Sequence, residues 1–72
     1  MDNKLIGIKI SKYMEKNDIS LEKLASILDI TPKTLKNKLQ GQGKFYVTDI
    51  IKMKEAFGLD LEEFEELFFS FK

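Results

Sequence analysis

Short stretches of apolar residues at helical spacing, each bounded by a turn signal, constrain the fold of this chain more than any other feature. Between residues 4 and 16, Ile6, Ile10, Tyr13 and Met14 are separated by the intervals of one helical face. Similar stripes recur along the chain, whereas alternation with a period of two occurs only around residues 6–10. The pattern predicts an all-α fold, a compact bundle of about five short helices forming one domain over residues 1–72.

Local signals indicate where the first two helices begin and end. Gly7 is expected only to weaken the first helix locally, and Asn17-Asp18 can supply the left-handed residue that closes it. Ser20 is a good N-cap for a second helix, which we expect to stop around Asp29.

The third helix has a strong start signal. Thr31 is followed by Pro32, and threonine can cap a helix while proline at the first helical position loses no hydrogen bond. We expect this helix to run to about Gln40. The stretch 41–47 then reads as a loop that directs Phe45 toward the core.

Two further helices are expected in the C-terminal third. Thr48 is predicted to cap the fourth helix and Gly58 to close it. Asp60, followed three residues later by Glu63, resembles the capping box that begins a fifth helix.

The second and third helices are separated by only Asp29-Ile30. So short a turn forces the two helices to cross steeply, which predicts a helix-turn-helix over residues 20–41. Such a crossing buries apolar side chains from both helices, namely Leu24, Ile27, Ile30, Leu35 and Leu39. One face of the third helix should therefore remain uncovered.

A helical projection shows what this open face carries. Opposite Leu35 and Leu39 lie polar and basic side chains: Lys33, Asn37 and Gln40, with Thr34 nearby and Lys36 and Lys38 on the flanks. Asparagine can pair with adenine and lysine can donate to guanine, while flanking cations can reach phosphates, so this face suits the major groove of DNA. The alternative is an ordinary solvated helix face, which is also polar.

Charge is unevenly distributed, although the 12 lysines and 12 acidic residues sum to zero. Residues 1–48 hold nine lysines and five acidic residues, whereas residues 49–72 hold three lysines and seven acidic residues. Within residues 31–48 there are four lysines and no acidic residue. Unopposed positive charge indicates a basic face, although a chance clustering of solvated lysines gives the same pattern.

Composition excludes several classes of function. The chain has no cysteine and no histidine, which removes disulfides, thiolate metal sites and the usual general base. The glutamates within residues 62–66 look like a solvated helix face and not like a catalytic site. We therefore expect that the chain is not an enzyme and that it binds no cofactor and no small-molecule ligand. No apolar run approaches the ~18 residues that cross a bilayer, and the N-terminus lacks a signal-peptide core, so we expect a cytoplasmic protein without a membrane partner.

Residues 20–41, SLEKLASILDITPKTLKNKLQG, resemble the helix-turn-helix of the phage Cro and repressor (XRE-type) family. The shared features are Ala25, Ile30-Thr31 at the turn, Leu35 and Gly41. Beyond the motif, Phe45, Thr48 and residues 49–53, 57–59 and 64–67 look like the last two helices of small phage-type members. The resemblance implies a lambda-repressor-like domain that binds double-stranded DNA as a sequence-specific transcriptional regulator, typically a phage or mobile-element repressor at a prokaryotic nucleoid.

The resemblance also implies roles for individual residues. Family members cap the recognition helix with a residue matching Thr31, which commonly touches phosphate. They read bases from positions matching Pro32, Lys33 and Asn37, and Lys44 matches a loop region that often grips phosphate. Projection and resemblance together predict nine DNA-contacting residues: Thr31, Pro32, Lys33, Thr34, Lys36, Asn37, Lys38, Gln40 and Lys44.

Two features depart from the family pattern, and a third observation bears on affinity. Leu21 stands where the family usually has a glutamine that bonds both phosphate and the recognition helix, and leucine can form neither bond. Asp29 replaces the usual turn glycine and tolerates a left-handed conformation at some cost. Arginine, the commonest specific contact to guanine, is absent, so we expect modest affinity per subunit.

The family normally binds as two copies on a pseudo-palindromic site, with recognition helices about 34 Å apart. This implies a homodimer, for which the C-terminal helix with Phe68, Phe69 and Phe71 is the candidate surface. The alternative is a terminal aromatic, Phe69, that folds back onto the core of its own chain. The alternative function is a protein-interaction module of the same fold, such as an antirepressor, that does not bind DNA and uses the acidic fifth helix.

Overall fold

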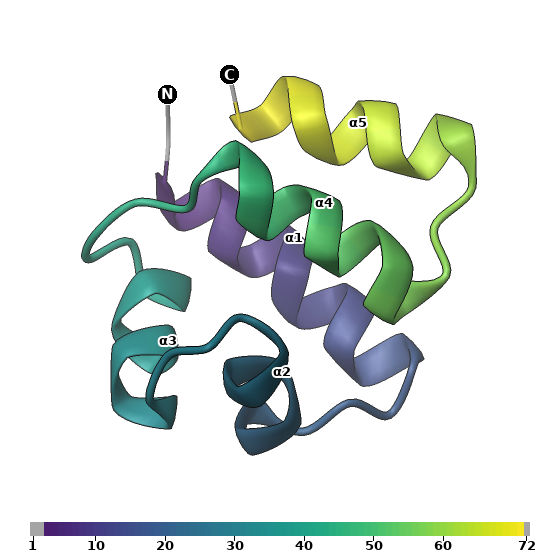
Figure 1. Ribbon diagram of the computed structural model, residues 1–72. Coiled ribbons are helices and arrows are strands. Elements are labelled where there is room, and N and C mark those ends of the chain that lie inside the picture. Colours follow the sequence, from purple (N-terminus) through teal and green to yellow (C-terminus); the bar gives the residue numbers. More distant parts are fainter. Residues whose placement is uncertain (1–2, 72) are drawn as a thin grey trace.

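The apolar stripes of five helical segments meet in one core in the computed structural model, which describes residues 3–71 (Figure 1). The helices are α1 (Asn3–Lys16), α2 (Leu21–Ile27), α3 (Pro32–Leu39), α4 (Val47–Phe57) and α5 (Leu61–Phe71). The predicted all-α fold is therefore confirmed for the described residues, which contain no strand.

Every helix contributes to the centre of the core. The largest fully buried side chains are Ile6, Ile10, Leu24, Leu35, Ile50, Met53 and Leu67. Phe45, from the loop before α4, is only 4% exposed and confirms that this aromatic turns inward. Among the described residues no polar or charged side chain is buried, so burial of apolar surface stabilises the fold without an internal polar network.

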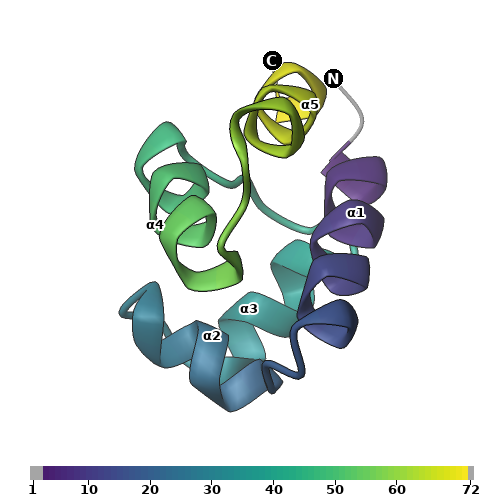
Figure 2. The same cartoon turned by 90° about the vertical axis from the view of Figure 1, so that its right-hand side faces the viewer.

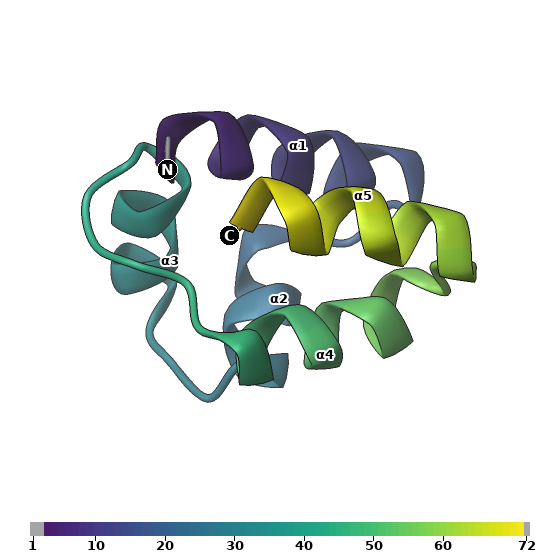
Figure 3. The ribbon, with the colours of Figure 1, turned by 90° about the horizontal axis from the view of Figure 1, so that it is seen from above.

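The helices are arranged with α2 and α3 at one end of the molecule and α5 at the opposite end (Figures 1 and 2). Helices α1 and α4 form the walls between them, and α5 lies above the space between these two helices (Figure 3). In the described part of the chain, no helix is long and apolar enough to cross a membrane.

The predicted N-caps of the second and third helices are confirmed, and the expected left-handed residue follows the first helix. The Ser20 hydroxyl accepts a hydrogen bond from the Lys23 backbone N–H at 3.1 Å, and the Thr31 hydroxyl accepts one from Thr34 at 3.2 Å. Asp18 and Asp29 adopt left-handed conformations, with φ of 54° and 58°. Both turns thus use aspartate where glycine would be less strained.

The prediction that Thr48 caps α4 is wrong. The helix begins at Val47, and its N-cap is Tyr46, whose backbone N–H donates to the Asp49 carboxylate at 2.9 Å. The carboxylate reaches back one turn to a backbone donor that the helix leaves unpaired, and this moves the start two residues earlier than expected. Gly58 closes the helix in the left-handed region, with φ of 63°, as predicted.

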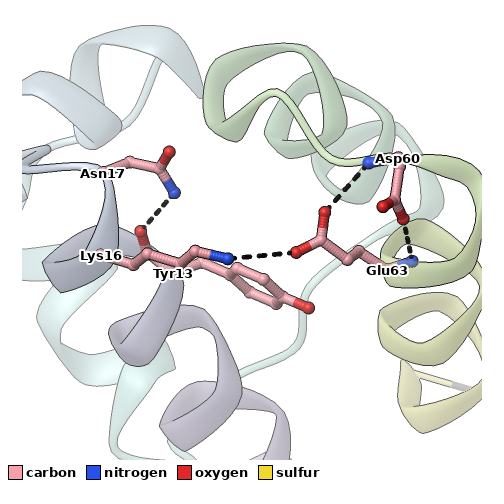
Figure 4. A network of polar contacts seen from close by, with 5 residues as sticks. All are labelled: Tyr13, Lys16, Asn17, Asp60 and Glu63. Atoms are coloured by element: carbon pink, nitrogen blue, oxygen red, sulfur yellow. Dashed lines mark hydrogen bonds and ion pairs between the residues drawn. The ribbon is translucent and has the colours of Figure 1, made fainter.

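The predicted capping box before α5 is confirmed. The Glu63 backbone N–H donates to the Asp60 carboxylate at 2.8 Å, and the Asp60 N–H donates to the Glu63 carboxylate at 3.1 Å (Figure 4). Each carboxylate satisfies a backbone donor of the other residue, so the start of α5 is fixed locally.

Candidate nucleic-acid interface

Helix α3 is held to the domain by one side. Leu35 is completely buried, and Leu39 is half-buried against the core. The predicted contact residues at its N-terminal end all remain open: Thr31, Pro32, Lys33, Thr34 and Lys36 are exposed, as is Gln40 beyond its last turn. The open face that the helical projection predicted is therefore present.

The two threonines at the start of α3 are already engaged with each other. The Thr31 hydroxyl accepts the Thr34 backbone N–H and donates its own proton to the Thr34 hydroxyl oxygen at 2.9 Å. The contact between the two hydroxyls uses one hydroxyl proton and leaves the other for an outside acceptor such as phosphate.

Asn37 is less open than the projection suggested. It is half-buried, and its backbone carbonyl accepts hydrogen bonds from the N–H groups of Gln40 and Gln42 at 3.1 and 2.9 Å. The chain after α3 folds back over this end of the helix. The Asn37 side-chain amide has no hydrogen-bond partner among the described residues, so its donors and acceptor stay available.

Lys38 was predicted as a flanking cation that reaches phosphate, and the structure places it half-buried beside two aromatic rings. Its ammonium nitrogen lies 5.8 Å from the centre of the Phe45 ring and 5.4 Å from that of Tyr46. Tyr46 itself is 61% exposed. Sequence reasoning missed Tyr46, because neither helical spacing nor the family pattern draws attention to a residue whose position depends on the path of the loop.

The loop after α3 gathers further basic and exposed groups. Gly41 and Gly43 have φ of 92° and 104°, a region that side chains rarely adopt, and they bring the chain back toward α3. Lys44 follows them and is exposed. The loop thus adds Lys44 and Tyr46 to the surface beside the C-terminal end of α3.

The acid-free basic segment and most of the C-terminal acidic residues lie at opposite ends of the molecule. The acid-free segment 31–48 contains α3 and the loop, whereas five of the six acidic residues between 55 and 66 follow Gly58, on α5 or directly before it (Figure 1). Asp29, in the turn before α3, is the exposed acidic residue nearest in sequence to segment 31–48. A polyanion that approaches α3 therefore meets cations that lie far from the glutamates of α5, whereas the exposed Glu22 of α2 lies at the same end of the molecule as α3.

Ion pairs join α5 to α1, and Figure 4 shows the one between Lys16 and Glu63. The Lys16 ammonium lies 3.4 Å from the Glu63 carboxylate, and the Lys9 ammonium lies 3.7 Å from that of Glu66. Between these helices is an open groove of about 380 Å³, with Tyr13 among its lining residues. Burial, and secondarily the charges of Glu63, Glu66 and Asp60, raise the pKa of the Tyr13 phenol.

Helix α5 carries the candidate dimer residues. Phe69 is 67% exposed, whereas Phe68 is half-buried. The Phe68 ring stacks on that of Phe64 and meets the Phe69 ring edge-on. The side chain of Phe71 lies outside the described residues. No group of His, Cys, Asp or Glu side chains in the described part could hold a metal ion.

Comparison with known proteins found no matching family model, no matching curated protein and no matching solved structure.

Proposed function

We propose that this chain is a lambda-repressor-like, sequence-specific DNA-binding regulator that inserts α3 into the major groove. One observation carries the proposal: α3 is anchored by Leu35 while an acid-free face with Lys33 stands open. A helix with side chains is about 10–12 Å in diameter, and the major groove is about 12 Å wide. The resemblance to phage-type repressors supports a repressor that acts in a prokaryotic cytoplasm.

Each contact residue has a role that its position supports. Lys33 and Asn37 read base edges, since ammonium and amide groups match guanine and adenine acceptors and donors. Pro32 and Gln40 lie at the two ends of the same helix and contact bases or sugars. Thr31, Thr34 and Lys36 position the helix on the backbone, because these groups donate to phosphate or fix the donor that does.

A second copy of the chain is the proposed partner on DNA, because one small module makes few base contacts. Helix α5 is at the opposite end from α3, so a partner docked beside α5 leaves α3 uncovered (Figure 2). The flank where α5 borders α4 suits a side-by-side pair. There Ile51 is 47% exposed and Phe68 is half-buried.

The proposal is tested by measuring affinity for labelled duplexes over a range of salt concentrations. Contact with Z phosphates gives a log–log slope of about −0.9Z. We expect the slope for the chain to be about −3 or steeper, and the slope for Lys36→Ala to be less steep. Lys12→Ala is the matched control, since Lys12 is exposed on α1 beside the α1–α5 groove.

The second candidate function is a protein-interaction module without DNA binding. It is favoured by the outer face of α5, where Phe69 is 67% exposed beside Glu62 and Glu65, which form no ion pair among the described residues. If no duplex binds even at low salt, this function replaces the first.

A further inference from the structure

The ammonium of Lys38 is held in place but is not neutralised. It lies near the rings of Phe45 and Tyr46, at 5.8 and 5.4 Å from their centres. Within the described residues the ion pairs are Lys9–Glu66 and Lys16–Glu63, so Lys38 has none. The nearest acid in the following segment, Asp49, uses its carboxylate to accept the Tyr46 backbone N–H.

The core and the loop enclose Lys38 on all but one side. Phe45 is 4% exposed and is fixed in the core. Gly43 has φ of 104°, and a side chain at this position would begin 3.5 Å from the Lys38 Cγ atom, so the loop backbone runs beside the lysine stem. Tyr46 is 61% exposed and forms the outer side of the site.

A cation over an aromatic ring keeps its hydrogen-bond donors. The attraction comes from the electrons of the ring face and consumes none of the three ammonium N–H groups. The Tyr46 hydroxyl also has no hydrogen-bond partner among the described residues. Two donor groups therefore stand at the C-terminal end of α3, one of them charged, with no protein acceptor assigned to them.

We propose that Lys38 and Tyr46 form a preorganised anchor for one backbone phosphate of the DNA strand that flanks α3. Lys38 supplies the charge, and Tyr46 is a positioning residue that holds the ammonium in place and donates its hydroxyl to the same phosphate. A lysine that is already ordered loses less side-chain freedom on binding than a solvated one. This inference rests on the proposed function, since the phosphate is that of the bound duplex.

A purely structural role makes a different prediction. If Lys38 only covered the aromatic rings, replacing it with methionine would preserve most of the packing and leave the salt dependence of binding unchanged. The two roles are therefore separated by salt dependence and by the energetic coupling between Lys38 and Tyr46.

The test is a double-mutant cycle on a labelled duplex of mixed sequence, with Lys38→Met, Tyr46→Ala and the double variant. We expect Lys38→Met to make the negative slope of log affinity against log salt concentration shallower by about 0.9. Tyr46→Ala should weaken binding about fivefold or more when Lys38 is present and less than twofold in the Lys38→Met background. Tyr46→Phe should retain part of the affinity, because the ring still holds the ammonium.

Three controls keep the outcome interpretable. Circular dichroism and thermal unfolding show whether each variant is folded. Lys38→Arg keeps the positive charge, so it should keep the salt dependence of binding that Lys38→Met reduces. Lys12→Met reports the effect of removing a remote charge. If Lys38→Met leaves the salt slope unchanged, or if the effects of the two substitutions are additive, the phosphate anchor is overturned while DNA binding stands. If the wild-type chain binds no duplex, both the proposed function and the phosphate anchor are overturned.

Discussion

Gly7 of α1 lies directly against the backbone carbonyl of Leu39 at the end of α3, so closely that a methyl group at Gly7 would overlap it. This contact sets how near α1 and α3 approach, and it therefore sets the position of α3 in the domain. By helix propensity alone, Gly7→Ala would stabilise α1 by about 0.5–1 kcal/mol. The overlap with backbone reverses the sign, and we expect a net loss of about 1–3 kcal/mol.

Denaturant unfolding of Gly7→Ala checks this expectation. Glu15→Ala is the control, because Glu15 is exposed on α1 and a surface substitution there should change stability by less than about 0.5 kcal/mol. A more stable Gly7→Ala would show that α1 can move away from α3 without cost.

Local signals were sufficient to predict the helix boundaries that depend on neighbouring residues. Ser20, Thr31 and Gly58 act through hydrogen bonds or dihedral angles within one turn, and all three were identified correctly. The start of α4 was missed, because the bond from Tyr46 to Asp49 competes with the expected cap at Thr48. When two possible N-caps lie only two residues apart, the sequence pattern alone does not decide which one begins the helix.

Contacts between distant segments were not predictable in the same way. Gly7 and Leu39 belong to helices far apart in sequence, and a glycine inside a helix has no local signature of close packing. Likewise, the placement of Lys38 over Tyr46 depends on two glycines with positive φ in the loop. The exposure of Lys33 was predicted, because it depends only on helical geometry and on Leu35 facing inward.

Thr31 permits a test that separates capping from DNA binding. Thr31→Ala removes the acceptor for the Thr34 N–H and should cost about 1 kcal/mol of stability. Thr31→Asp supplies a good capping acceptor and should retain stability, but its charge repels phosphate. We expect Thr31→Asp to bind duplex more weakly than Thr31→Ala at low salt, and the two to converge as salt is raised. Equal binding by the two variants would argue against phosphate near the start of α3.

Asn37 is the residue through which we expect the chain to discriminate among DNA sequences. Asn37→Ala should cost about 1–3 kcal/mol on the preferred site and little on unrelated duplexes. The preferred site is obtained by selection from a random duplex pool, and affinities are compared at one salt concentration. Gln42→Ala, an exposed amide in the following loop, is the control. A loss that is the same for all duplexes would assign Asn37 to the backbone instead of the bases.

Tyr13 makes stability depend on pH in the alkaline range. Burial and the neighbouring glutamates raise its pKa in the folded state above the ordinary value of 10.0. The unfolded chain then loses the phenolic proton first, so this contribution to stability is complete below about pH 10 and falls as pH rises through the folded pKa. Denaturant unfolding at several pH values should show a shallower alkaline decline for Tyr13→Phe than for the wild type. Identical declines would mean that the phenol ionises equally in both states.

The arrangement of α5 predicts which of its faces joins two copies on DNA. Leu67 is completely buried, and Phe69 follows it two residues later, which is about 200° around the helix, so Phe69 points away from the core. A pair joined through Phe69 would turn its two α3 helices in opposite directions, because α3 lies at the other end of the domain (Figures 1 and 2).

A pair that reads one duplex needs both α3 helices on the same side, about 34 Å apart. We expect a pair joined along the flank between α4 and α5 to meet this requirement. There the Lys54 ammonium lies 5.3 Å from the centre of the Phe64 ring, and Figure 3 shows α4 and α5 running in opposite directions. Ile51 precedes Lys54 by about one turn on α4, and Phe68 follows Phe64 by about one turn on α5. We therefore expect Ile51→Lys to abolish self-association in sedimentation velocity and to weaken duplex binding at least tenfold, whereas Phe69→Lys leaves both nearly unchanged. If Phe69→Lys alone dissociates the pair, the copies join end to end, and each α3 must then bind a separate duplex.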